Sequence, residues 1–220
     1  MAGRMTRREE IAKEQIFLIL NQQGYRTYAS LFNLFDLFLT KDPNVAAYMI
    51  PSQAKIVIND GLDIAQVSTI VRHEILHEYL THEMRLLKHL AQEHGLNYDQ
   101  LTDMNLEDIK SELYSNDTFN IAADYEISNR GYTEDDKSIV RALKINDQVV
   151  RGLVTEDDHP DWTNLSVEDM FDKLRQEQKK DQQNNQQNGQ GQNSEKTYSA
   201  DYIAGWEQAI ADIKAGKVKF

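Results

Sequence analysis

The segment His73-Glu-Ile-Leu-His77 has the residue types and the spacing needed to bind a metal ion and to activate water. In a helix, residues four apart project from the same face, so the imidazoles of His73 and His77 can bind one zinc ion. Glu74 then reaches the space beside that ion, where its carboxylate can accept a proton from water and pass it to a leaving amine. The pattern predicts zinc-dependent hydrolysis, with two histidine ligands and Glu74 as the general base.

The surroundings of this segment favour a metal site over a chance match. With six histidines in 220 residues, a random occurrence of the pattern is roughly a one-in-a-hundred event. Apolar neighbours predict that the helix is mostly buried, and a buried histidine pair without a metal is costly to satisfy. These neighbours are Val67, Ile70, Val71, Ile75, Leu76 and Leu80.

A catalytic zinc ion usually has three protein ligands and one open position. The chain contains no cysteine, so the third ligand must supply nitrogen or oxygen. On an unbroken helix, His82 lies about 140° round from His77 and points elsewhere. The favoured candidate is Asp124, on a downstream helix whose neighbouring alanines allow close packing. Two alternatives stay open: Asn120 as the ligand, with Asp124 orienting a ligating histidine, and Glu126, about 200° round the helix from Asp124.

Hydrophobic periodicity and turn residues predict a mainly helical α+β domain with a small sheet and an active-site helix. That helix is expected to begin near Asp63 or Val67 and to run unbroken to about His94, with Gly95 as its stop. The short β-branched segment 54–59 is predicted to be a strand. The other expected helices cover residues 7–22, 28–39, 106–129 (as one helix or two) and 167–174, the last after the capping sequence Ser166-Val-Glu-Asp169.

The composition changes after Leu174. Residues 176–197 are rich in Gln and Asn and lack large apolar side chains, which predicts a flexible tether. Residues 198–220 carry apolar side chains at helical spacing, which predicts an amphipathic helix that docks on the domain or on a protein partner. The expected organisation is therefore a domain over residues 1–175, followed by the tether and the C-terminal helix.

The charge and the apolar pattern limit the partners of the chain. A net charge of −12 argues against nucleic acid or an anionic membrane as partner, since either needs a basic protein surface. The charged N-terminal residues are not followed by the apolar core of a signal peptide, and the apolar stretches are too short to span a membrane. The prediction is a cytoplasmic protein whose partner is a peptide or protein substrate.

Two segments of the chain resemble a known family. His73-Glu-Ile-Leu-His77 and Asn120-Ile-Ala-Ala-Asp-Tyr-Glu-Ile127 are similar to a metallopeptidase domain that, in many bacterial and phage proteins, precedes a von Willebrand factor A-like domain. The resemblance spans residues 10–175 and implies a zincin fold, in which the segment 55–59 is the edge strand that aligns a peptide substrate. The chain departs at Ser128, where the family usually has Asn, and a tether follows the domain in place of an A-like domain.

These observations together predict a zinc metallopeptidase of the zincin type. The alternative is a catalytically inactive zincin-like module that binds or regulates through its C-terminal helix, although Glu74 would have no purpose there. Tyr79, Tyr125 and Tyr132 are candidate hydrogen-bond donors to the tetrahedral intermediate, although a packing or surface role is favoured for each.

Overall fold

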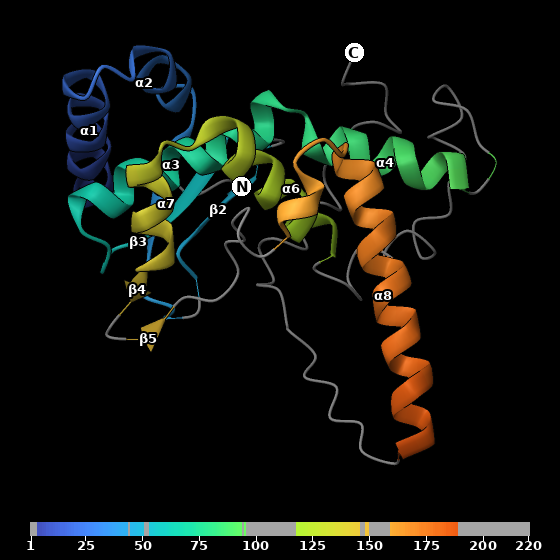
Figure 1. Cartoon of the computed structure of the whole chain (residues 1–220). Coiled ribbons are helices and arrows are strands. Elements are labelled where there is room, and N and C mark those ends of the chain that lie inside the picture. The colour runs from blue at the N-terminus through green and yellow to red at the C-terminus, as the bar shows by residue number, and fades with distance from the viewer. Residues whose placement is uncertain are drawn as a thin grey trace.

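The computed structural model describes residues 4–43, 45–50, 53–93, 95, 118–145, 148–149 and 159–188. This part of the chain is mainly helical with one small three-stranded sheet, which confirms the predicted α+β class (Figure 1). Its helices are α1 (Arg7–Gln22), α2 (Arg26–Phe32), α3 (Ile64–Tyr79), α4 (His82–Glu93), α6 (Thr118–Gly131), α7 (Glu134–Arg141) and α8 (Val167–Asn188). Its strands are β1 (Asp36–Thr40), β2 (Ala47–Ile50), β3 (Lys55–Asn59), β4 (Lys144–Ile145) and β5 (Gln148–Val149).

The three-stranded sheet has the order β1-β3-β2, with β1 parallel and β2 antiparallel to β3. The predicted strand at 54–59 is confirmed as β3. Its expected place at the edge of the sheet is wrong, because β3 is paired on both sides. The physical reason is its continuous apolar run, Ile56-Val57-Ile58, which is buried on both faces as a central strand requires.

The segment 28–39, predicted as a single helix, is divided between a helix and a strand. α2 ends at Phe32, and residues 36–40 form β1, which pairs along its whole length with β3. Leu37 is fully buried opposite Ile56. Pairing and burial in the sheet therefore override the helical periodicity of the local sequence.

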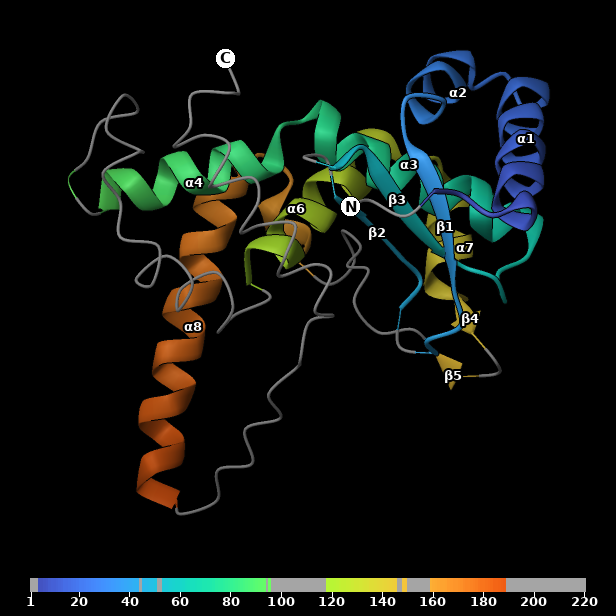
Figure 2. The same cartoon turned by 180° about the vertical axis from the view of Figure 1, so that it is seen from behind.

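Two hydrophobic cores meet along α3 and α6. In the first, α1, α2 and α3 lie on one side of the sheet (Figure 2), and the core includes Ile56 and Ile58, which share one face of β3. In the second, α4, α6 and α8 enclose Phe119, Trp162 and Phe171. Because α3 belongs to the first core and α6 to the second, side chains between these two helices lie at the junction of the cores.

The expected unbroken helix from residue 63 to 94 is wrong. α3 ends at Tyr79, Thr81 has a φ of 54°, and α4 begins at His82 as a separate helix (Figure 1). A β-branched residue in this left-handed region costs on the order of 1–3 kcal/mol. The break persists because it allows Leu86 and Leu90 of α4 to enter the second core.

α8 is longer than predicted. Its N-terminus has the expected cap, since the Ser166 hydroxyl donates to Asp169 at 2.7 Å and accepts from the Asp169 amide at 3.1 Å. The helix continues to Asn188, so residues 176–188 of the predicted tether are helical. Gln, Glu and Lys are good helix formers and extend a helix that is already nucleated. The remainder of the tether and the predicted C-terminal helix lie outside the described residues.

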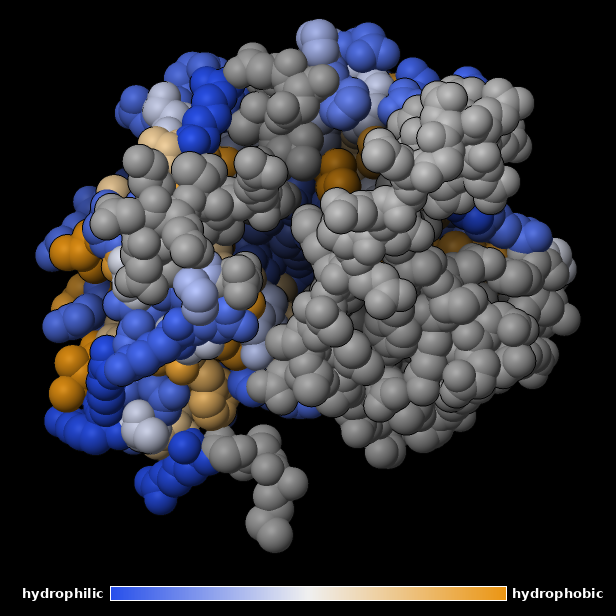
Figure 3. Space-filling view, turned by 90° about the horizontal axis from the view of Figure 1, so that it is seen from below, coloured by the Kyte–Doolittle hydropathy of each residue, from blue (hydrophilic) through white to orange (hydrophobic). Residues whose placement is uncertain are grey.

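The visible surface of the described residues is mostly hydrophilic. Viewed from below, polar and charged side chains cover much of it, and apolar side chains form separate patches (Figure 3). Among the described helices, none combines the length and the apolar character needed to cross a bilayer.

Candidate metal centre

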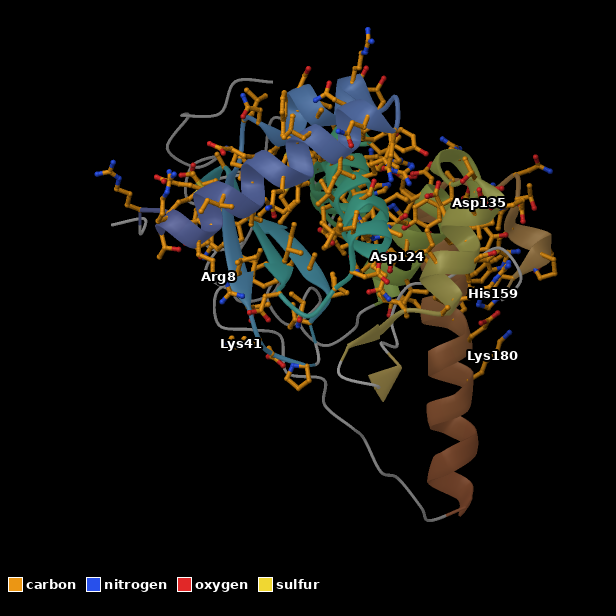
Figure 4. The ribbon with its side chains drawn as sticks, turned by 90° about the vertical axis from the view of Figure 1, so that its left-hand side faces the viewer. Arg8, Lys41, Asp124, Asp135, His159 and Lys180 are labelled. Atoms are coloured by element: carbon orange, nitrogen blue, oxygen red, sulfur yellow. The ribbon has the colours of Figure 1, made fainter. Side chains whose placement is uncertain are left out.

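Three ligand-type atoms converge between α3 and α6. The Nε2 atoms of His73 and His77, one turn apart on α3, are 2.9 Å from each other. The Oδ1 atom of Asp124, on α6, is 3.1 Å from Nε2 of His73 and 3.2 Å from Nε2 of His77. Asp124 lies where α6 faces α3 (Figure 4). The three atoms therefore form a nearly equilateral triangle.

The size and burial of this triangle fit a zinc ion. Ligand atoms at about 2.0–2.1 Å from a tetrahedral zinc ion are about 3.3 Å apart, close to the 2.9, 3.1 and 3.2 Å observed. Asp124 is 2% exposed and His73 is 3% exposed. Oδ1 of Asp124 accepts no hydrogen bond within the described part of the chain. One cation placed between these buried atoms would satisfy all three at once.

Small residues let α6 pack closely against its neighbours. Ala122 and Ala123, which precede Asp124, are fully buried in the second core, with side chains of α4 and α8. At the C-terminal end of α6, a Cβ added to Gly131 would lie 2.5 Å from Cδ1 of Leu76 on α3. The glycine thus allows the close approach of α6 to α3.

Glu74 lies beside the triangle and has an unusual carboxyl group. Within the described ranges, its carboxylate has no hydrogen-bond or ion-pair partner. Burial raises the pKa of Glu74 to about 7, with His77 opposing this shift and the charge of Asp124 adding to it. A carboxyl group with a pKa near neutrality can both accept and donate a proton.

Tyr132 supports His73 from behind. Its hydroxyl lies 2.7 Å from Nδ1 of His73, the ring nitrogen that faces away from the triangle. Burial, with the nearby charges of Asp124 and Glu74, raises the pKa of Tyr132 well above its usual value, so the hydroxyl stays neutral. Of the other two candidate tyrosines, Tyr125 donates to the backbone carbonyl of His159, and Tyr79 is 71% exposed. The hydroxyls of Tyr132 and Tyr125 thus have protein partners, whereas Tyr79 faces solvent.

His82 was expected to point away from the site, and this expectation is wrong. Its Nδ1 lies 3.0 Å from Nδ1 of His77, and its Nε2 lies 2.9 Å from Oε2 of Glu126. The helix break at Thr81 returns His82 to the side of His77, which an unbroken helix would not do. Helical spacing does not predict this contact, because the turn between His77 and His82 depends on the positive φ of Thr81.

The other two candidate ligands on α6 lie away from the triangle. Asn120 is exposed. Glu126 is buried, but its carboxylate contacts His82, Arg85 at 2.7 Å and Arg130 at 2.9 Å. Of the three candidates, the structure brings only Asp124 to the two histidines of α3.

The environments of His82 and Glu126 favour a neutral imidazole beside an ionised carboxylate. Burial lowers the pKa of His82 to about 4, although its hydrogen bond to Glu126 opposes the shift. Burial alone would raise the pKa of Glu126, but His82, Arg85 and Arg130 together hold it below its usual value. Arg85 also binds Glu168 on α8 through two hydrogen bonds of 2.8 Å, which joins this network to the second core.

Replacing Glu168 with Gln is expected to lower the free energy of unfolding by roughly 1 kcal/mol near pH 7, and by less in acid. Hydrogen bonds from Arg85 lower the pKa of Glu168 to about 2, although burial opposes this. The folded state therefore favours the carboxylate, so its contribution is complete above the unfolded-state pKa of about 4.3 and is lost as the pH falls below it. Urea unfolding of both metal-free proteins should show their stabilities converging as the pH falls from about 5 to about 2. A constant difference across this range would contradict the ion pair.

A second group of possible ligands, His89, Glu93 and Asp172, lies between α4 and α8. Here Arg175 donates to both carboxylate oxygens of Glu93, at 2.6 and 2.7 Å. The guanidinium already supplies the positive charge that a metal ion would bring. The triangle of His73, His77 and Asp124 is therefore the better candidate for a metal site.

The fold and the site define a class of protein: a mainly helical α+β domain with a buried His/Asp group able to bind a metal ion. The chain matches the sequence profile of a family described as "putative metallopeptidase domain" over residues 58–219. The match covers well over half of the chain, so the chain belongs to this family. It begins within β3, includes α3 and α6, and extends past the predicted boundary at residue 175. No curated protein and no solved structure matches the chain.

Proposed function

We propose that this chain is a zinc-dependent peptidase in which His73, His77 and Asp124 bind the metal and Glu74 acts as general base and then as acid. The observation that carries the proposal is the convergence of Nε2, Nε2 and Oδ1 within 3.2 Å beside a carboxyl group with a raised pKa. Membership of a metallopeptidase family supports it. Two imidazoles and one carboxylate leave a fourth position open, as catalytic zinc sites require.

The residues of the chain divide the chemical work. A zinc ion, when bound, supplies Lewis acidity that brings the pKa of a water molecule to about 7 and polarises a carbonyl group. Glu74 accepts the proton that the attacking water loses and donates it to the nitrogen of the scissile bond, so an O–H bond breaks and an N–H bond forms. Tyr132 and His82 hold the rings of the two histidines from behind.

The sheet suggests where a peptide substrate would lie. β3 is central, so within the described residues β1 and β2 are the strands with outer edges. Of these two strands, β2 makes the more extensive contact with α3, the helix of His73 and His77. An extended peptide that adds to the outer edge of β2 would make backbone hydrogen bonds and run beside that helix. In this proposal, residues 47–50 replace residues 55–59 as the edge that aligns the substrate.

Metal content and peptide hydrolysis test the proposal together. The purified chain should contain one zinc ion per molecule by elemental analysis and should cleave members of a peptide library, followed by mass spectrometry. Stripping with a chelator should abolish cleavage, and added zinc should restore it. His73→Ala should lose both zinc and cleavage, whereas His89→Ala on α4 should keep both. A wild-type protein without zinc, whose stability His73→Ala does not change, would overturn the proposal.

A further inference from the structure

A continuous line of polar contacts runs from His77 into the second core. Nδ1 of His77 lies 3.0 Å from Nδ1 of His82, and Nε2 of His82 lies 2.9 Å from Oε2 of Glu126. His82 is 3% exposed and Glu126 is 1% exposed, so solvent does not compete for these contacts. The line ends at Arg85 and Arg130, which bind the Glu126 carboxylate.

Metal binding at His77 would allow one arrangement of protons along this line. If Nε2 of His77 binds a metal ion, its Nδ1 carries the proton and can only donate. Nδ1 of His82 must then accept, which places the proton of His82 on Nε2, facing Glu126. The Glu126 carboxylate accepts that hydrogen bond. Each contact then has one donor and one acceptor, and the ring of each histidine has a single tautomer.

A strained backbone conformation at Thr81 supports this arrangement. His82 reaches His77 because Thr81, with a φ of 54°, ends α3 and redirects the chain. Thr81 is exposed, and its side chain makes no hydrogen bond within the described part of the chain. The left-handed conformation costs a β-branched residue on the order of 1–3 kcal/mol, and such strain is often found where it positions a functional group.

We propose that His82 is a positioning residue for the metal site: it connects His77 to the buried carboxylate of Glu126 and keeps Nε2 of His77 as the nitrogen that faces Asp124. This inference rests on the proposed function, since it requires His77 to be a ligand. Most metal-bound histidines donate their second nitrogen directly to a carboxylate, a carbonyl or water. In this chain an imidazole stands between the ligand and the carboxylate.

Zinc affinity, measured by competition with a chromophoric chelator, tests the proposal. His82→Leu is expected to weaken zinc binding about 10- to 100-fold. His82→Asn should recover part of the loss, because its amide oxygen can accept from His77 near the position of Nδ1. The matched control is His89→Leu, since His89 is also on α4 and contacts a carboxylate, Asp172 at 3.0 Å, but does not touch a proposed ligand. Its affinity should stay within twofold of wild type.

The tautomer of His82 provides a second test that needs no variant to fold. In the zinc-loaded wild-type chain, long-range ¹H–¹⁵N spectra of the imidazoles should show His82 protonated on Nε2 and His77 on Nδ1. His82 protonated on Nδ1, or His82→Leu with unchanged zinc affinity, would overturn the positioning role while leaving the proposed peptidase intact. A wild-type chain that binds no zinc would overturn both proposals.

Discussion

Glu74→Gln should lower kcat for peptide hydrolysis by about 10²- to 10⁴-fold while the protein keeps its zinc. Gln has nearly the shape of Glu but cannot accept a proton from water, so the loss reports the proton transfer alone. Glu74 is not one of the three residues that form the proposed metal site, so the zinc content should stay at one ion per chain. The measurement is steady-state hydrolysis of a cleaved library peptide, together with elemental analysis of the same preparation.

The matched control for this experiment is Glu78→Gln. Glu78 lies one turn after Glu74 on α3 but is exposed. Its replacement removes the same charge from the same helix and should leave kcat unchanged. If Glu74→Gln hydrolyses the peptide as fast as wild type, Glu74 is not the base. If wild type and Glu74→Gln both bind zinc but neither cleaves any peptide, the chain is the inactive, zincin-like binding module.

Asp124→Asn should weaken zinc binding by more than about 100-fold, which exceeds the 10- to 100-fold loss typical of a residue that only orients a ligand. The amide keeps the shape of the side chain, but its oxygen is neutral and a much poorer zinc ligand than a carboxylate. A ligand that binds only the folded state raises stability according to its concentration and affinity. The increase in Tm that zinc gives the wild-type chain should therefore be largely lost, as differential scanning fluorimetry would show.

Asn120→Ala is the control for the third ligand, because Asn120 lies on the same helix but is exposed. It should keep wild-type zinc affinity and the full increase in Tm. The opposite result, with Asp124→Asn binding zinc normally and Asn120→Ala failing to bind it, would support the alternative in which Asn120 is the ligand. Equal losses of zinc affinity in Asp124→Asn and Asn120→Ala would indicate that the fold of α6, and not one of its side chains, supports the site.

The features that the sequence predicts well are those that depend on neighbouring residues. α1 spans the predicted residues 7–22, and the β-branched segment before α3 forms the strand β3. The cap of Ser166 and Asp169 forms because both partners lie within one turn of a helix. His73 and His77 lie side by side for the same reason, since helical geometry alone brings residues four apart together.

The features that the sequence did not predict depend on residues far apart in the chain. β1 exists because Leu37 and its neighbours pair with β3, and local periodicity does not report that pairing. His82 contacts His77 because one residue, Thr81, adopts a positive φ that the packing of α4 maintains.

The sequence by itself therefore determined the two histidines, the glutamate between them and the helix that carries them, because a single turn of helix contains all three. Only the tertiary structure decided which residue of α6 faces them. Asn120 and Asp124 share one face of α6 by spacing, Glu126 lies about 200° round the helix from Asp124, and the close approach of α6 to α3 at Gly131 brings Asp124 to the histidines. The same packing turns Glu126 toward Arg85 and His82, because a buried carboxylate needs charged or hydrogen-bonding partners.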